Sequence, residues 1–244
     1  MAAVRWGARR FDEPTRRRLR RLRHRAWWGN LRRQRPLSDK FGYDRGEPID
    51  RAYMRRYLEA QRGCVRGVVG EVAERRYADL LGGPKVQEVA VIDNDPSNPA
   101  ATLVADLSSP DALAPASFDC LIVTQVLQYL PRPWLGLQGL VAALRPGGTL
   151  LVAAPALTPH DLHEADEGDY WRFWPAGLET VLRDADPSSA VDVRSYGSLV
   201  TAVAFLYGLS VEDLRPEELL RQDLRFPVVV CGRLDRPVND EALG

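Results

Sequence analysis

Residues 67–83 read GVVGEVAERRYADLLGG, and this stretch decides the fold. Its first half is a run of small and β-branched residues, typical of a buried strand, that ends at the acidic side chain of Glu71. The second half, ERRYADLL, predicts a very short helix closed by Gly82 and Gly83. A buried strand, an acid, a tight turn and a helix form the first unit of an α/β protein.

The same alternation continues along the chain. Pro48 or Ile49 begins a helix in which Tyr53 and Tyr57 recur at four-residue spacing. Later helices are predicted over residues 133–144, 174–185 and 199–209, and strands over residues 86–93, 101–107, 117–125, 145–155, 191–197 and 226–234. With the first strand this makes seven, and strands that alternate with helices predict a mostly parallel sheet with helices on both faces.

The composition predicts one α/β domain with extensions. The chain has 244 residues, 45% of them hydrophobic, and its formal net charge is zero. It has no run of eighteen apolar residues and no apolar signal-peptide core, so we expect a cytoplasmic protein without a membrane span. Three scattered cysteines without a CxxC or Cys/His pairing predict neither disulfides nor a zinc site. We divide the chain into a basic arm (1–35), an α/β domain (36–234) and a tail (235–244).

The N-terminal arm is strongly basic. Residues 1–35 contain thirteen arginines against Asp12 and Glu13, so the remaining 209 residues carry the opposite charge. PTRRRLRRLRHR, residues 14–25, predicts a short basic helix with a narrow apolar stripe. Two interpretations remain open: a solvated arm that packs against the acidic body, or an arm that binds phosphates, nucleic acid, an anionic membrane or a partner protein.

A second charged segment, FGYDRGEPIDR, occupies residues 41–51. Five charged side chains lie within eight residues, namely Asp44, Arg45, Glu47, Asp50 and Arg51. This density is typical of an interlocked ion-pair turn, and equally of a lid over a pocket. The sequence does not decide between the two.

The predicted strands end in polar side chains. These are Glu71, Asp93 with Asp95, Asp106, and Thr124 with Gln125. Because ligands of parallel sheets bind beyond the carboxyl ends of the strands, we expect a pocket there. Carboxylates repel a phosphate and favour hydroxyls, an ammonium group or a fixed positive charge. The same carboxylates could instead cap a helix or form turns.

The order of these motifs resembles a class I S-adenosylmethionine-dependent methyltransferase. The resemblance rests on EVAE after the first strand, acid after the second, ADL after the third, FDCLIVTQVLQYL and LRPGGTLLVAAP, and it runs from about Trp28 to Cys231. WGNLRR, FGYDRGEPIDR, DPSNPAATLVADL and GDYWRF are similar to a bacterial subgroup found alone or beside glycosyltransferase domains. The resemblance implies a Rossmann-like seven-stranded sheet, parallel except for its last strand, and S-adenosylmethionine as the cofactor.

The resemblance also implies roles for the strand-end residues. Asp93 or Asp95 would accept the two ribose hydroxyls of the cofactor, a task that needs a carboxylate at a strand tip. Asp106 with Leu107 would contact the adenine. Gln125 would line the floor beneath the sulfonium.

The turn after Glu71 departs from the family pattern. In the family that acid approaches the amino-acid end of the cofactor through the following turn, which contains a glycine where this chain has Ala73. Glycine permits unusual backbone angles and a close ligand approach. If Ala73 needs a positive φ, we expect roughly 1 to 2 kcal/mol of strain. Ala73 therefore weakens cofactor binding without excluding it.

The catalytic candidates lie in PHDLHEADEGDYWRF, residues 159–173, which follows the fifth strand. His160, His163 or Asp169 would remove a proton, and Tyr170 with neighbouring aromatic side chains would shape the substrate wall. The alternative is a solvated acidic loop opposite the arginine arm. Two histidines three residues apart lack a third ligand, so we predict no metal.

Three functions compete. The first is a methyltransferase acting on an O or N nucleophile of a small molecule, such as a sugar or specialised metabolite. The second is the same scaffold turned to cyclisation or elimination, with altered or absent cofactor use. The third is a noncatalytic module whose basic arm docks to a glycosyltransferase or another partner, with nucleic acid disfavoured. Fold likeness alone does not decide among them.

Overall fold

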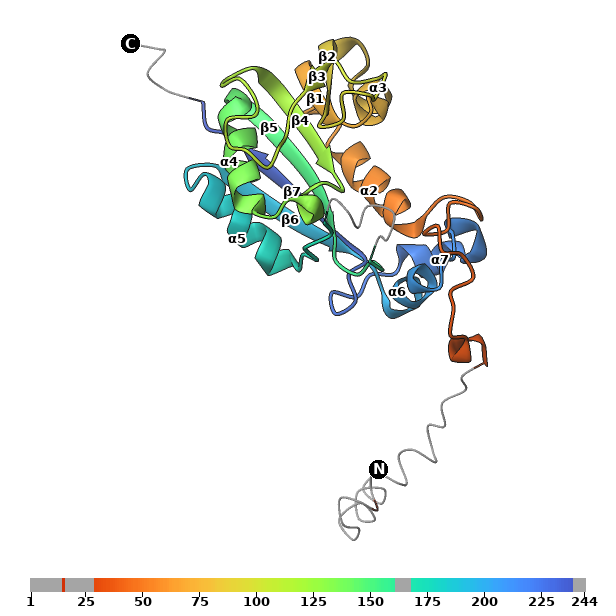
Figure 1. Ribbon diagram of the computed structural model, residues 1–244. Coiled ribbons are helices and arrows are strands. Elements are labelled where there is room, and N and C mark those ends of the chain that lie inside the picture. The colour runs from red at the N-terminus through yellow and green to blue at the C-terminus, as the bar shows by residue number, and fades with distance from the viewer. Residues whose placement is uncertain (1–14, 16–28, 161–167, 239–244) are drawn as a thin grey trace. The chain divides into compact units, whose positions relative to one another are not determined.

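The computed structural model describes residue 15 and residues 29–160 and 168–238 (Figure 1). Most of the predicted basic helix, His163 and the end of the predicted tail lie outside the described residues. The chain divides into two compact units, Met1–Pro36 and Leu37–Gly244. The second unit contains the whole predicted α/β domain apart from its first residue.

Leu37–Gly244 is built on a seven-stranded sheet with the order β3-β2-β1-β4-β5-β7-β6. β1 to β5 pair in parallel, whereas β7 runs antiparallel to both β5 and β6. The predicted Rossmann-like fold and its antiparallel last strand are confirmed. The strands are β1 (Gly67–Val72), β2 (Val86–Asp93), β3 (Leu103–Val104), β4 (Phe118–Thr124), β5 (Leu144–Pro155), β6 (Ala190–Tyr196) and β7 (Val229–Asp235).

Helices cover both faces of this sheet (Figure 1). α4 and α5 pack on one face, and α2, α3 and α6 pack on the other. The α-helices are α2 (Ile49–Ala60), α3 (Arg76–Gly82), α4 (Pro133–Ala143), α5 (Pro175–Ala185), α6 (Leu199–Leu206) and α7 (Pro216–Leu220); short 3-10 turns are η2 (Gly29–Arg32), η3 (Gly83–Lys85), η4 (Leu127–Tyr129) and η5 (Val211–Asp213).

The apolar sequence of β4 explains why two helical layers form. Leu121 and Val123 belong to the core under α4 and α5, whereas Cys120 and Ile122 belong to the core under α2, α3 and α6. All four side chains are fully buried. Each buried Leu, Ile or Val side chain stabilises the fold by about 1.5–3 kcal/mol, so a central strand that is apolar on both faces favours helices on both sides.

Several element boundaries differ from those predicted, and two of the differences matter for the sheet. β3 has only two residues, because Asp106 and the serines after it form a turn where a longer strand was expected. β7 continues through Asp235, and the Arg236 amide donates to the Gly148 carbonyl at 2.9 Å. The sheet therefore includes residues that the sequence assigned to the tail.

A helical insertion between β6 and β7 holds the FGYDRGEPIDR segment in place. Arg45 forms an ion pair with Asp213 of η5 at 2.6 Å, and Pro48 forms an isolated bridge with Ser210. On the other side of the segment, Arg55 of α2 pairs with Glu47 at 3.0 Å. These contacts place the start of α2 at the carboxyl edge of the sheet.

Within the described residues, no helix combines the length and the apolar character that crossing a bilayer requires.

Candidate functional site

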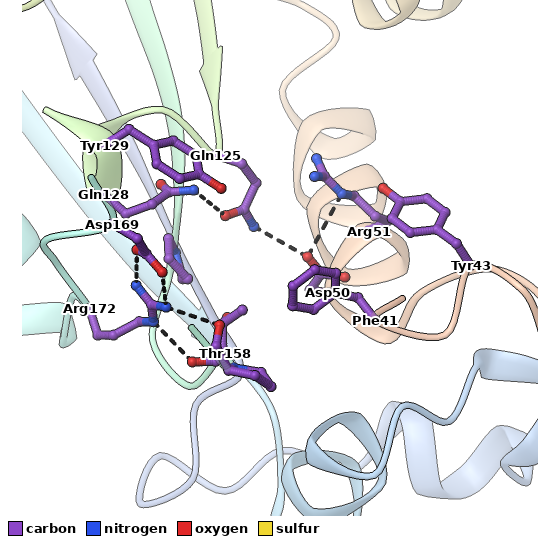
Figure 2. Close-up of a pocket in the computed structure, with 12 residues that line it drawn as sticks. Phe41, Tyr43, Asp50, Arg51, Gln125, Gln128, Tyr129, Thr158, Asp169 and Arg172 are labelled. Atoms are coloured by element: carbon purple, nitrogen blue, oxygen red, sulfur yellow. Dashed lines mark hydrogen bonds and ion pairs between the residues drawn. The ribbon is translucent and has the colours of Figure 1, made fainter. Parts of the chain in front are cut away.

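Two hollows lie at the carboxyl ends of the strands. The larger, here the strand-end cavity, has a volume of about 560 Å³. Residues that follow β1, β2, β3 and β4 line it, among them Ala73, Asp93, Asn94, Asp106, Leu107, Val126 and Leu130. The smaller, here the polar pocket, has a volume of about 130 Å³ and lies between the start of α2, the end of β4 and the segment after β5 (Figure 2). Tyr129 lines both, so the two hollows are neighbours.

Ala73 adopts a left-handed backbone conformation, with φ of 67°. Its amide donates to the Ile92 carbonyl at 2.8 Å, and its carbonyl accepts from the Asn98 side chain at 3.0 Å. Both ends of the residue are thus fixed by neighbours. This conformation costs an L-residue roughly 1–2 kcal/mol, and the Ala73 side chain adds a methyl group to the cavity lining.

We expect Ala73→Gly to tighten cofactor binding by up to about tenfold, because removing an obstruction of about 1.4 kcal/mol in the complex corresponds to that factor, whereas relief of the backbone strain changes stability. Stability should rise by less, since glycine also gains about 0.4–1 kcal/mol of entropy in the unfolded chain. Calorimetry with S-adenosylhomocysteine and urea unfolding measure the two effects.

Ala116→Gly is the matched control for this substitution. Ala116 is also exposed and has φ of 51°, but it does not line the strand-end cavity. It should therefore change stability without changing cofactor affinity. Equal affinity of Ala73→Gly and the unsubstituted protein would show that the methyl group does not obstruct the ligand.

Glu71 is buried and acts as the N-terminal cap of α3. Its two carboxylate oxygens accept the backbone N–H groups of Tyr77 at 3.0 Å and Ala78 at 2.7 Å. Burial raises the pKa of Glu71 to about 7, against the lowering effect of these two hydrogen bonds. Glu71 does not line the strand-end cavity, so the helix-cap interpretation describes its contacts and its predicted cofactor role is limited to shaping the turn.

The structure separates the two carboxylates that follow β2. Asp93 lines the strand-end cavity; one of its oxygens accepts from the Asp95 amide at 3.0 Å, and the other accepts from the Asn98 side chain at 2.5 Å. Asp95 does not line the cavity; it accepts from the Ser97 amide and hydroxyl, each at 2.8 Å, and this lowers its pKa. Of the two alternatives, only Asp93 is placed to meet a ligand in the cavity.

Asp106 and Leu107 follow β3 and both line the strand-end cavity. Asp106 accepts from the Ser108 amide at 2.9 Å and from its hydroxyl at 2.8 Å, which fixes the carboxylate at the cavity edge. Leu107 is buried and adds an apolar surface. Asp106 therefore forms a turn and also lines the strand-end cavity.

The FGYDRGEPIDR segment is both an ion-pair turn and a pocket wall. The ion pairs of Arg45 and Glu47 tie it down, whereas Phe41, Tyr43, Asp50 and Arg51 line the polar pocket. The two interpretations that the sequence left open therefore describe different residues of one segment.

Gln125 lies in the polar pocket at the end of β4. It has φ of 56°, its amide nitrogen donates to Asp50 Oδ2 at 3.3 Å, and its carbonyl accepts from Gln128 at 3.2 Å (Figure 2). It does not line the strand-end cavity, which differs from the predicted place on the cofactor floor. The reason is that this left-handed backbone directs the side chain toward α2.

Asp169 lines the polar pocket and forms an ion pair with Arg172. Both of its oxygens accept from Arg172, the second at 2.6 Å, and its side chain is 2% exposed. Arg172 also donates to the Thr158 carbonyl at 3.0 Å, which fixes the segment after β5. These contacts give Asp169 a structural role beside the pocket, and its role as a base stays a prediction.

The other catalytic candidates within the described residues, His160 and Tyr170, lie outside both hollows. His160 and Tyr170 are exposed, and neither lines the strand-end cavity or the polar pocket. His163 is outside the described residues. The Trp171 indole donates to the Leu130 carbonyl at 2.9 Å, so the aromatic residues of GDYWRF fix a loop of the cavity wall.

Asp50 is the carboxylate best placed for chemistry, and the sequence did not single it out. It is 7% exposed at the first turn of α2, and Oδ1 has no hydrogen-bond partner in the described chain. Burial raises its pKa, while Arg51, at 3.8 Å, opposes the rise. Arg51, Gln128 and Arg172 were also missed as pocket residues. The signal was present, because FGYDRGEPIDR and GDYWRF each carry part of this pocket.

Two kinds of unfavourable feature concentrate around these hollows. Four non-glycine residues of the described chain have a positive φ, and three of them, Phe41, Ala73 and Gln125, line one hollow or the other. Five buried side-chain polar atoms lack a partner in the described chain, and four of them belong to residues of the polar pocket. Each such atom costs about 1–3 kcal/mol, and strained or unpaired groups cluster at functional sites.

Comparisons with known proteins agree with this geometry. Residues 62–152 match the family described as a methyltransferase domain. No curated protein matches the chain. Among solved structures, the chain is similar to an S-adenosylmethionine dependent methyltransferase from Mesorhizobium loti, with 16% identity, a TM-score of 0.51, and 77% and 98% of the two chains covered.

Two further structures have the same fold. One is a chain in the complex between the Haloferax volcanii Trm112 methyltransferase activator and the putative methyltransferase, with 16% identity, a TM-score of 0.50, and 82% and 99% coverage. The other is the [4+2]-cyclase SpnF, with 15% identity, a TM-score of 0.50, and 80% and 85% coverage. The chain therefore has the Rossmann-like fold of these solved structures, and its residues 62–152 match the family described as a methyltransferase domain.

Proposed function

We propose that the chain binds S-adenosylmethionine in the strand-end cavity and methylates a small molecule held in the polar pocket. The observation that carries this proposal is that the two hollows are neighbours and share Tyr129. Transfer between two bound groups needs the two sites side by side, because the enzyme's main contribution is to hold the reactants in line.

The lining of the strand-end cavity fits this cofactor. Its volume of about 560 Å³ lies in the range of small-molecule sites, about 300–1,000 Å³. The described residues that line it include two carboxylates, Asp93 and Asp106, and no lysine or arginine. This favours a ligand with hydroxyls, amines and positive charge over a dinucleotide with phosphates. Ile92, Leu107 and Val126 supply apolar surface for a flat base.

When bound, S-adenosylmethionine supplies an electrophilic methyl group. Asp93 would hold the ribose hydroxyls, and Asp106 with Leu107 would hold the adenine. On the other side, Gln125 and Gln128 hold each other and orient Asp50. We propose that Asp50 removes the proton of the acceptor group. The raised pKa of Asp50 makes this side chain a better base near neutral pH than an exposed aspartate.

The proposed acceptor is a small molecule that carries an O or N nucleophile. A sugar or a specialised metabolite is the class that we favour. The bacterial subgroup, the cytoplasmic location and docking to a glycosyltransferase or other partner through the basic arm stay predictions. The small volume of the pocket, about 130 Å³, supports a small acceptor rather than a protein or nucleic acid.

A repurposed reaction is the second candidate. Ala73 has a left-handed backbone and lies in the turn beside the strand-end cavity, where the family pattern has glycine. The solved structure of SpnF, which has the same fold, is named as a [4+2]-cyclase. A chain of this kind would bind the cofactor weakly or not at all. Cofactor affinity therefore separates the two candidates.

Calorimetry with S-adenosylmethionine and S-adenosylhomocysteine tests the proposal. We expect both to bind the full-length protein, and Asp93→Asn to weaken binding by about 10- to 100-fold, since hydrogen bonds to charged groups contribute about 1.5–3 kcal/mol. Asp95→Asn is the matched control, because Asp95 belongs to the same turn but not to the cavity lining, and it should leave affinity unchanged. No heat and no thermal shift at millimolar ligand would reject the proposal.

A further inference from the structure

The polar pocket contains an unusual set of unpaired hydrogen-bonding atoms. Asp50 Oδ1, Arg51 Nε, Gln128 Oε1 and Thr158 Oγ1 are buried and have no hydrogen-bond partner in the described chain. All four residues line this one pocket of about 130 Å³ (Figure 2). The remaining unpaired atom, Tyr57 Oη, belongs to a residue outside it. Buried polar atoms in folded proteins are almost always paired, so this set indicates a ligand that completes it.

The charges of the described pocket lining cancel. This lining contains two carboxylates and two guanidinium groups. Asp50 lies 3.8 Å from Arg51, and Asp169 forms a two-point ion pair with Arg172. The described lining therefore offers no net charge to a ligand. A carboxylate, phosphate or ammonium group would enter without a compensating partner and would have to be desolvated at a cost.

The four unpaired atoms also differ in whether they donate or accept hydrogen bonds. The oxygens of Asp50 and Gln128 can only accept, the Arg51 nitrogen can only donate, and the Thr158 hydroxyl can do both. An ammonium group would satisfy only acceptors, and an ionised acid would satisfy only donors. A hydroxyl donates and accepts through one atom, so adjacent hydroxyls on one neutral frame match the whole set.

We propose that the polar pocket recognises the neutral, multiply hydroxylated part of the acceptor, such as a sugar or cyclitol ring, through Asp50, Arg51, Gln128 and Thr158. This inference rests on the proposed function and narrows its acceptor from an O or N nucleophile to a hydroxyl. The side chains of Phe41, Tyr43 and Tyr129 border the same pocket and supply apolar faces for the C–H surface of such a ring.

Saturation-transfer NMR and calorimetry with three probes of one ring size test this. Glucose is neutral, glucosamine is cationic and glucuronate is anionic at pH 7. We expect the full-length protein to bind glucose at least about tenfold more tightly than either charged probe, both with and without S-adenosylhomocysteine.

Two substitutions turn this preference into a sharper test. Asp50→Asn leaves the pocket with a net positive charge, so glucuronate should become the best bound of the three probes. Arg51→Met leaves a net negative charge, so glucosamine should become the best bound. Arg56→Met, exposed on the same helix and outside the pocket lining, should keep the preference for glucose.

The outcomes are distinguishable from those of the cofactor experiment. Equal affinity for all three probes, or no change of preference in the two pocket variants, would overturn this inference even if S-adenosylhomocysteine binds. The expected charge pattern without any binding of S-adenosylhomocysteine would support the pocket assignment and reject the proposed methyl transfer.

Discussion

Asp50→Asn is expected to lower kcat/KM for methyl transfer by a factor of about 10² to 10⁴, the usual contribution of a general base. The amide keeps the shape of the side chain and can still accept a hydrogen bond, but it cannot take up a proton. Burial raises the pKa of Asp50, and the ionised form is the active one. The activity of the unsubstituted protein should therefore rise with pH through a pKa above the ordinary value for aspartate, and the variant should lose this rise.

Two measurements separate this role from a structural one. S-adenosylhomocysteine affinity should not fall in Asp50→Asn, because Asp50 does not line the strand-end cavity, whereas the midpoint of thermal unfolding reports the cost of leaving Arg51 without its counter-charge. Glu59→Gln is the matched control on the same helix, since Glu59 pairs with Arg55 and does not line the pocket. An Asp50→Asn variant with full activity and an unchanged pH profile would remove Asp50 from the reaction.

Glu71 should make the protein less stable as the pH rises from about 4.5 to about 7. The pKa of this side chain is about 7 in the folded protein and 4.5 in an ordinary setting. Between these values the folded state binds more protons than the unfolded state, so the free energy of unfolding falls with rising pH. A difference of this size corresponds to about 3 kcal/mol, lost in full above pH 7. The stabilisation is present below pH 4.5.

Urea unfolding of Glu71→Gln across this pH range measures the effect. The difference in free energy of unfolding between the unsubstituted protein and the variant should shrink or change sign as the pH rises, because glutamine does not titrate. Glu88→Gln, exposed on the neighbouring strand β2, should keep the pH dependence of the unsubstituted protein. A pH-independent difference for Glu71→Gln would mean that the two N–H groups of α3 keep this carboxylate ionised.

The sequence predicted the sheet well because the central strands carry a strong local signal. β4 and β5 are apolar on both faces, and such strands have few alternatives to a central place between two helical layers. The length of β3 was less predictable, since Asp106 and the serines after it decide where the strand stops through turn contacts that strand periodicity does not contain.

The sequence predicted the strand-end cavity better than the polar pocket, and the physical reason lies in how each is built. Asp93 ends β2, and Asp106 and Leu107 lie two and three residues after β3, so the direction of the strands places them at the cavity. The polar pocket instead combines α2, the left-handed Gln125 and the segment after β5. Its geometry depends on long-range contacts such as Arg45 with Asp213, which no local pattern reveals.

A crystal structure of the full-length protein with S-adenosylhomocysteine is the most direct test of the central claim. We predict that the ligand occupies the strand-end cavity, with its ribose hydroxyls at Asp93, its adenine against Asp106 and Leu107, and its sulfur toward the polar pocket. The ligand bound elsewhere on the molecule, or lying in this cavity with its sulfur turned away from the polar pocket, would contradict the account.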